Sequence, residues 1–276
     1  MTPHGIAESM ADLKRRLGDR LAELCRADVY DDLGSILEHH AVHFDLGAVK
    51  PTSAHVEFAH GLLDREMFDL PFPVVLFTGE MSPHAAFMAW REKDDTSLHI
   101  CTFGPVKMPG DDTIVATIPL MSIKLHGPPP VASMRGDWRA LVAWPMHSRK
   151  TGKVLSHEEH EESSEKALGL VLGATALLMS REVETTRHEP SAKLNRRREA
   201  KDRPPIRPRY TVTIRPEYQR VYREAHEADA SGRASPRIHW RRGHFRRIRD
   251  DLVIPIAPMI VGAKADAEAK RQAAGD

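Results

Sequence analysis

The stretches Ala85-Ala-Phe-Met-Ala-Trp-Arg91 and Ser97-Leu-His-Ile-Cys-Thr-Phe103 flank the polar connector Lys93-Asp94-Asp95-Thr96. Both stretches are short, apolar and rich in residues that favour strands, and the connector has the length of a hairpin loop. This pattern predicts two adjacent antiparallel strands, which place a sheet at the centre of the fold.

Further strand patterns flank this hairpin on both sides. Pro73-Val-Val-Leu-Phe-Thr78 is an apolar run bounded by turn formers, and residues 113–125 and 138–144 carry strand patterns separated by Gly127-Pro128-Pro129-Pro130. We therefore expect an antiparallel sheet with helices packed on one side of it.

Helical periodicity is clearest near the N-terminus and after residue 156. Apolar residues recur every three to four positions at Met10, Leu13, Leu17, Leu21 and Leu24, and a second amphipathic stretch follows at Tyr30, Leu33, Ile36 and Leu37. Ser156 and Glu159 have capping-box spacing, which predicts a helix that runs to about His188 and stops before Pro190. Residues 167–179 are apolar nearly all round, which is typical of a buried core helix.

Charge divides the chain more sharply than its total of +1 suggests. Residues 1–190 hold 19 Lys and Arg against 28 Asp and Glu, a net of −9, whereas residues 191–276 hold 21 against 11, a net of +10. Such asymmetry favours contact with a polyanion, because a concentrated positive field attracts polyphosphate and releases its counterions. A solvated basic face, or a basic arm docked on the acidic part of the same chain, explains the pattern equally well.

These patterns together predict an α+β protein with four parts. Residues 1–190 form a region of helices and antiparallel sheet that ends in the apolar helix, and residues 191–209 form a basic Pro/Arg-rich linker or arm. Residues 210–262 form a small basic α+β module, in which residues 210–214 are a strand, 216–230 a helix, and 237–249 and 252–261 two further strands. Residues 263–276 form a disordered tail.

The basic module contains the densest cluster of candidate functional residues, Arg237-Ile-His-Trp-Arg-Arg-Gly-His-Phe-Arg-Arg-Ile-Arg249. Arginine pairs bidentately with phosphate, and aromatic side chains stack on unpaired bases. The residues predicted to bind nucleic acid are the arginines and aromatics of this cluster and three arginines of the preceding arm: Arg196, Arg197, Arg198, Trp240, Arg241, Arg242, Phe245, Arg246, Arg247 and Arg249. DNA and RNA remain equal candidates.

Two alternatives use the same segment differently. In the first, His239 and His244 are general acid and base of a nucleic-acid-cleaving enzyme, and Arg242 stabilises the developing charge. In the second, the chain is a structural or protein-interaction protein that binds a protein partner or forms a homo-oligomer. The arginines are then simply its solvent-exposed face. We favour binding without catalysis over the enzyme.

The absence of several well-known motifs from the sequence disfavours some classes of function. It contains no dinucleotide-binding glycine motif, Walker loop, nucleophile elbow or Cys-x-x-Cys, so we expect no cofactor. Cys25 and Cys101 are expected to be buried reduced thiols, and the spacing of the histidines does not favour a metal site. No apolar run is long enough to span a membrane, and the N-terminus does not have the pattern of a signal peptide, so we expect a cytoplasmic protein.

Several short motifs in the C-terminal part of the chain indicate its origin. Leu194-Asn195-x-x-Arg198, Pro204-Pro-Ile-x-x-x-Tyr210-x-x-x-Ile214, His239-x-x-Arg242-Gly243-His244-Phe245 and Gly262 resemble a signature of a group of uncharacterised phage and prophage proteins. The resemblance spans roughly residues 165–262, and the chain departs from it at Val253-Ile-Pro-Ile-Ala-Pro258, where the group has an aromatic-rich strand. It implies a viral or mobile-element origin, and hence a bacterial host cell, but no particular activity.

The residue patterns therefore predict a protein that binds nucleic acid through its arginine-rich module, and the resemblance implies a phage or prophage origin. This prediction depends on the arginines being gathered and accessible, and not neutralised by acidic side chains of the same chain.

Overall fold

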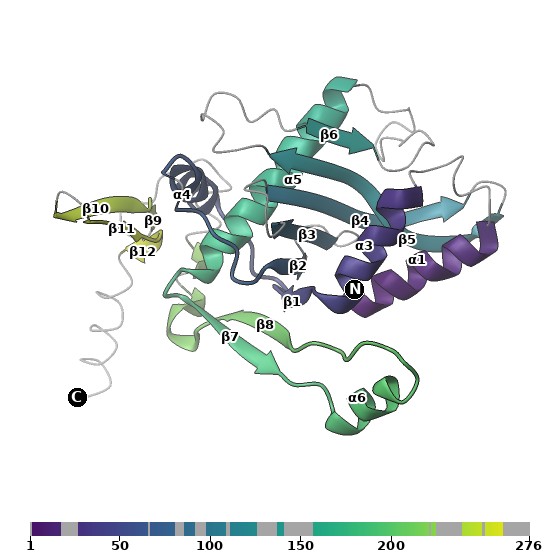
Figure 1. The fold of residues 1–276 in the computed structure, drawn as a ribbon. Helices are drawn as coiled ribbons and strands as arrows, with labels where there is room; N and C mark the ends of the chain where they lie inside the picture. Colours follow the sequence, from purple (N-terminus) through teal and green to yellow (C-terminus); the bar gives the residue numbers. More distant parts are fainter. Residues whose placement is uncertain are drawn as a thin grey trace.

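A large mixed sheet organises the described part of the chain. The structure, a computed structural model, describes residues 2–17, 27–65, 67–80, 86–91, 98–108, 111–125, 137–140, 157–220, 222–224, 239–249 and 252–261. Eight described strands form the sheet in the order β6-β5-β4-β3-β2-β1-β8-β7 (Figure 1). Their bounds are β1 (Val42–Asp45), β2 (Val74–Thr78), β3 (Ala86–Arg91), β4 (Leu98–Met108), β5 (Asp111–Leu125), β6 (Asp137–Ala140), β7 (Val183–His188) and β8 (Arg209–Ile214).

The predicted hairpin forms the middle of this sheet. Strands β3 and β4 pair antiparallel with Met88 opposite Cys101, and β5 extends the meander on the far side of β4. Strand β1 differs, because it lies parallel to both β2 and β8. The α+β class is confirmed, whereas the expectation of a wholly antiparallel sheet is wrong at β1.

Helices lie on both sides of the sheet. Helices α4 (Ser53–Leu63) and α5 (His157–Leu178) pack against each other, and their buried side chains form one core cluster with Val75, Phe77, Phe87 and Ala89. Side chains alternate between the two faces of a strand, so Leu76 and Met88 face the other way, and both are fully buried. Helices α1 (Pro3–Leu17) and α3 (Ala27–His39) lie on that side, so the expectation of helices on one side is wrong (Figure 1).

Helix α5 confirms the predicted core helix and corrects its end. Val171, Leu172 and Leu177 are fully buried, and a Cβ at Gly173 would lie 2.8 Å from the Cβ of Pro51, so this glycine lets the chain before α4 approach closely. The helix ends at Leu178, not near His188, because residues 183–188 form β7, antiparallel to β8. Their β-branched residues suit a strand, and the partner strand is supplied by the later chain.

The predicted linker folds back onto the body. It contains helix α6 (Ala192–Glu199), and Asn195 exchanges two hydrogen bonds with the backbone of Ile206. The Arg207 Nε donates to the carbonyl of His39 at 2.8 Å. The following strand β8 lies inside the large sheet between β1 and β7, so the boundary expected near residue 210 does not coincide with an edge of the sheet.

Two titratable side chains, those of His43 and Cys101, are buried in the sheet. The Nε2 of His43 lies 2.7 Å from the Oγ1 of Thr78 across β1 and β2, and burial lowers the pKa of this histidine to about 4, although nearby Asp45 raises it in part. Cys101 is a buried free thiol, as expected, and burial raises its pKa well above the ordinary value. Cys25 lies outside the described residues.

Within the described residues, none of the helices is long and apolar enough to cross a bilayer.

Candidate nucleic-acid interface

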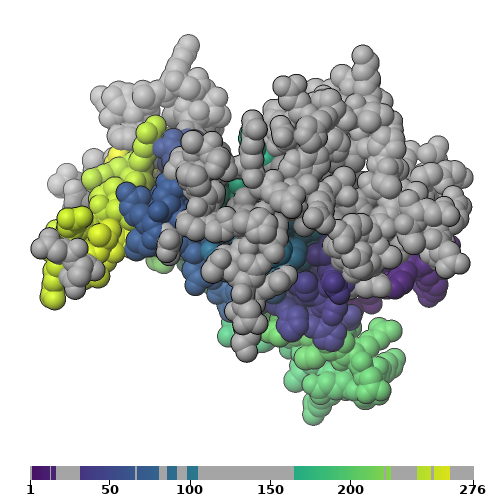
Figure 2. All heavy atoms as spheres, turned by 45° about the horizontal axis from the view of Figure 1, so that its top comes forward, coloured from purple at the N-terminus to yellow at the C-terminus, as the bar shows by residue number. Residues whose placement is uncertain are grey.

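The arginine-rich cluster forms a two-stranded ribbon at one end of the molecule. Strands β10 (His244–Arg249) and β11 (Leu252–Ile256) pair antiparallel, and β9 (His239–Arg241) pairs separately with β12 (Met259–Val261). The ribbon lies beside α4, far from α1 and α6 (Figure 1), and it occupies the edge of the molecule in Figure 2. The predicted strands over residues 237–249 and 252–261 are therefore confirmed within the described range, each divided in two.

The base of the ribbon is anchored on α4 by aromatic packing. Phe245 stacks on Phe58 with 5.8 Å between ring centroids, and the guanidinium of Arg65 lies 4.0 Å above the Phe245 ring. Gly61 makes room for this ring, because a Cβ there would lie 2.9 Å from it, and a Cβ at Gly243 would lie only 2.2 Å from Phe58. Small residues at both positions are thus required for the ribbon to sit this close to the helix.

Strand β12, which follows β11, fixes the same base of the ribbon to the core. Ile260 is almost fully buried, and its backbone N–H donates to the Oε1 of Glu182 at 3.0 Å. Ser180 donates to the carbonyl of Pro258 and also lies 3.1 Å from the Nε2 of the buried His55 of α4. The ribbon is therefore a fixed part of the fold.

The arginines of the arginine-rich cluster make few ion pairs with acids among the described residues. Arg241, Arg246, Arg247 and Arg249 are all exposed, and among the described residues none of these four has an ion pair. Arg242 pairs with Glu57 at 3.1 Å, but its side chain is 79% exposed, so solvent screens this pair strongly. Asp250 and Asp251, which follow Arg249, lie outside the described residues.

The structure does not bring the arginines of the arm to this surface. Arg196 and Arg197 are exposed on α6, far from the ribbon (Figure 1). Arg198 is buried, and its guanidinium donates to Glu38 at 3.0 Å, to the carbonyl of Pro204 at 2.7 Å and to the Nε2 of His4 at 2.9 Å. These contacts satisfy the guanidinium internally and assign Arg198 a structural role.

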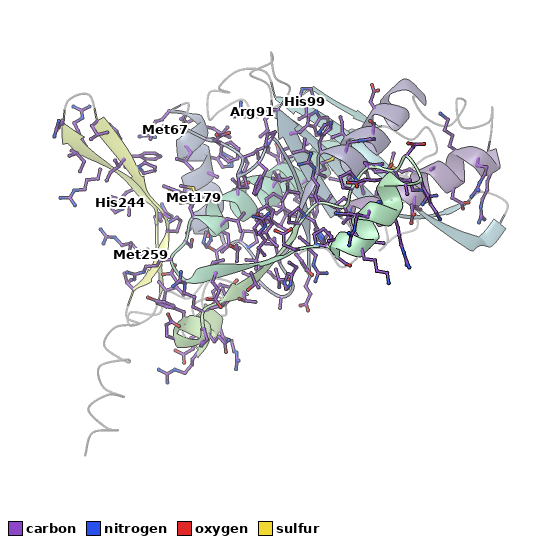
Figure 3. All side chains as sticks on the ribbon, turned by 60° about the horizontal axis from the view of Figure 1, so that its bottom comes forward. Met67, Arg91, His99, Met179, His244 and Met259 are labelled. Atoms are coloured by element: carbon purple, nitrogen blue, oxygen red, sulfur yellow. The ribbon has the colours of Figure 1, made fainter. Side chains whose placement is uncertain are left out.

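Among the predicted aromatic and histidine candidates, Phe245 is placed unfavourably for its predicted role of stacking on a base. Phe245 faces α4, so its ring is not free to stack on a base. His244 is half-buried on β10 (Figure 3), and His239 lies on β9, in the other two-stranded sheet. The side chains of His239 and Trp240 lie outside the described part. Nor does any group of three His, Cys, Asp or Glu side chains within that part have an arrangement suited to a metal ion.

Sequence reasoning missed the anchor of this surface. Helix α4 has no counterpart among the predicted elements, and its contact with Phe245 joins residues far apart in the chain. The sequence did offer one signal, because Gly243 was expected to supply a bulge or to allow close backbone approach, and a Cβ there would lie 2.2 Å from Phe58. Phe245 was expected to stack on a base, not on a helix of the same chain.

The fold and this surface define an α+β protein that presents arginines on an anchored two-stranded ribbon. Residues 53–249 match the AcrVA2-like family, described as the anti-CRISPR type V subtype A2 family. The match covers more than half of the chain, and the chain belongs to this family. Comparison with curated proteins and with solved structures gave no match.

The matched range begins with the first residue of α4 and ends with the last residue of β10. It thus includes the anchoring helix and the arginine-bearing strand of the ribbon. The family is associated with phages, in agreement with the phage and prophage resemblance, while the C-terminal signature itself stays a prediction.

Proposed function

We propose that this chain is a phage-encoded anti-CRISPR protein that acts in the bacterial cytoplasm against a type V system, and that its ribbon binds the phosphate backbone of nucleic acid. Membership of the anti-CRISPR family supports the first part. The observation that carries the second is the accessibility of Arg241 on β9 and of Arg246, Arg247 and Arg249 on the ribbon, all of which are exposed and have no ion pair among the described residues.

The proposed contacts are made by Arg241, Arg242, Arg246, Arg247 and Arg249, with Trp240 beside them on β9. Arginine suits this role because its planar guanidinium donates two parallel hydrogen bonds to a phosphate and keeps its charge at any physiological pH. A ribbon held rigidly by α4 loses little conformational entropy on binding. Arg196 and Arg197 would contribute only to a ligand that also reaches α6.

Binding across a salt series tests the nucleic-acid part. The purified chain is titrated against labelled single- and double-stranded DNA and RNA from about 50 to 300 mM salt, and log Kd is plotted against log salt concentration. Each of Arg246→Ala, Arg247→Ala and Arg249→Ala should weaken binding and lower the slope by about one, since each removes about one phosphate contact.

Arg15→Ala is the matched control for these variants. Arg15 is an exposed arginine of α1, far from the ribbon, and it should leave both affinity and slope unchanged. An affinity that does not depend on salt, or an equal effect of the α1 variant, would contradict the proposal.

A plaque assay tests the anti-CRISPR part separately. Expression of the chain in a bacterium whose type V system targets a phage should restore plaque formation by that phage. Plaque counts that stay at the level of cells without the chain would count against this activity, whatever the ribbon binds.

A further inference from the structure

The two faces of the ribbon differ in composition. Arg246 lies opposite Ile254 in the antiparallel register, and opposed residues point to the same face. The register shifts between Arg247 and Arg249, so Ile248 is the extra residue of a bulge and faces Leu252 together with Arg249. One face therefore carries Ile248, Leu252 and Ile254 beside arginines, whereas the other carries Phe245 and packs on α4.

The aliphatic side chains of this face are unusually exposed. Ile248, Leu252 and Ile254 are 45%, 43% and 38% exposed, and they account for three of the five large apolar side chains that are most exposed among the described residues. They lie next to one another on one face, and so form a single patch. Contiguous exposed apolar side chains with a polar rim mark interaction surfaces, and isolated ones do not.

Phosphate binding does not account for these three residues. Aliphatic groups offer no hydrogen-bond donor to a phosphate, and Thr would serve the strand equally well without exposing apolar area to water. The anchoring contacts do not account for them either, because Phe245 and Ile260 make those contacts from elsewhere. The patch thus calls for a ligand with an apolar surface of its own.

The surrounding charge selects the kind of ligand. A second copy of this chain would bring its own arginines against Arg246 and Arg249, and like charges at close range repel. A partner surface with an aliphatic centre and acidic residues around it would complement both the aliphatic side chains of the patch and the arginines at its margin. Protein surfaces combine these two features in the usual arrangement of a hydrophobic core and polar rim.

We propose that the face formed by Ile248, Leu252 and Ile254, rimmed by Arg246 and Arg249, is a docking surface for the effector protein of a type V CRISPR system. The effector is taken as the partner because of the family to which the chain belongs, so this inference rests on the anti-CRISPR part of the proposed function. The patch contacts an aliphatic area of the effector with acidic residues at its margin. It binds the protein itself and requires no nucleic acid.

Calorimetric titration of the full-length chain into the purified, RNA-free effector tests this docking surface. Ile248→Thr, Leu252→Thr and Ile254→Thr keep or improve strand preference while removing aliphatic area, and each should weaken binding roughly tenfold. The heat capacity change of binding should be negative for the wild type and smaller in magnitude for the variants. Leu194→Thr is the matched control, because Leu194 is 44% exposed on α6, far from the ribbon.

Two further variants distinguish the docking surface from loosening of the ribbon and from nucleic-acid binding. Ile254→Arg retains the strand and tests the patch even if multiple Thr substitutions loosen the ribbon, and it should weaken binding at least as much as Ile254→Thr. Arg247→Ala removes an arginine of the other face, so it should lower the salt slope for nucleic acid and leave effector affinity within about threefold. If Arg247→Ala leaves the salt slope unchanged while the Thr variants weaken effector binding, the proposed phosphate contacts fail and the docking surface stands; the reverse pair of results refutes the docking surface alone.

Four outcomes would overturn the inference. They are an effector that does not bind the wild-type chain, Thr variants that bind as tightly as the wild type, a wild-type dimer that these variants dissociate, and binding to vesicles of acidic phospholipid that the same variants abolish. A chain that restores plaque formation without binding the effector would refute the docking surface and leave the anti-CRISPR part of the function standing.

Discussion

Replacing Phe245 by Ala should detach the ribbon from α4 while leaving the large sheet folded. The ring is half-buried, so we take about half of the 3–5 kcal/mol typical of a fully buried Phe→Ala change, or about 2 kcal/mol. Loss of the Arg65 contact, with the guanidinium 4.0 Å from the ring centroid, adds about 0.5–1 kcal/mol. The sum is close to 3 kcal/mol, all of it at the base of the ribbon.

Hydrogen exchange measured by mass spectrometry detects this loss of stability at the ribbon separately from the rest of the fold. A loss of roughly 2.8 kcal/mol corresponds to about a hundredfold faster exchange of the β10 and β11 amides, because these amides open with the ribbon. Amides of β2 and β3 should exchange at wild-type rates, since their strands are fully buried in the sheet. Arg65→Gln keeps the Phe245 ring and removes the cation–π contact, together with the hydrogen bond from the Arg65 guanidinium to the carbonyl of Gly61. The loss of about 0.5–1 kcal/mol from the cation–π contact should accelerate exchange of the ribbon by only about two- to fivefold.

The reasoning fails if ribbon amides in Phe245→Ala exchange at the wild-type rate. It also fails if exchange accelerates equally in β2 and β3, because the ring would then support the whole fold. Either result would show that Phe245 does not hold the ribbon on α4 in the way its packing indicates.

Two further predictions concern the other end of the molecule. Arg198→Met should destabilise the fold by about 2 kcal/mol in urea unfolding, because it removes the guanidinium partner of the half-buried Glu38 carboxylate and leaves His4, whose Nδ1 lies 3.5 Å from it. Glu38→Gln/Arg198→Met should recover part of that loss, and an unchanged unfolding midpoint would contradict the structural role of Arg198. His43 makes stability depend on pH. Its folded pKa of about 4 lies below the ordinary 6.5, so the unfolded chain takes up a proton first, and the stability present above pH 6.5 falls by about 3 kcal/mol as pH drops towards 4. Replacing His43 by Gln, which keeps a polar group near Thr78, should flatten this part of the curve, and an equally steep curve in the variant would assign the effect to other groups.

The parts of the fold that the sequence predicts are those in which local pattern and final environment agree. The β3–β4 hairpin and the buried part of α5 depend on neighbouring residues, so composition and periodicity were sufficient. Strand β1 was missed because it has four residues and is stabilised by β2 and by β8, which comes more than 160 residues later. Strand β7 was assigned to the end of the preceding helix because its partner β8 follows only after α6 and the extended chain behind it, so the neighbouring residues do not show the pairing.

The same distinction between local pattern and distant contacts applies to the residues of the candidate surface. Exposed arginines over residues 237–249 were predicted on a single strand, which the structure divides into β9 and β10; their exposure was predictable because their density in the sequence carries over directly to the surface. The difference in environment between Arg198, which pairs internally, and Arg247 was not predicted, since it depends on whether Glu38 lies nearby in space. The aliphatic face of the ribbon was missed because it requires knowing that residues 248, 252 and 254 share one side and that nothing described covers them.

The position of β8 between β1 and β7 has a consequence for how the chain is made. A ribosome that has released only the first 200 residues has already produced α1 to α5, yet one edge of β1 still lacks its neighbour. Contacts of such long sequence separation are slow to form, and an unpaired strand edge invites association with other chains. Synthesis therefore passes through an interval in which the sheet is open at β1, and it closes only after residues 209–214 have emerged.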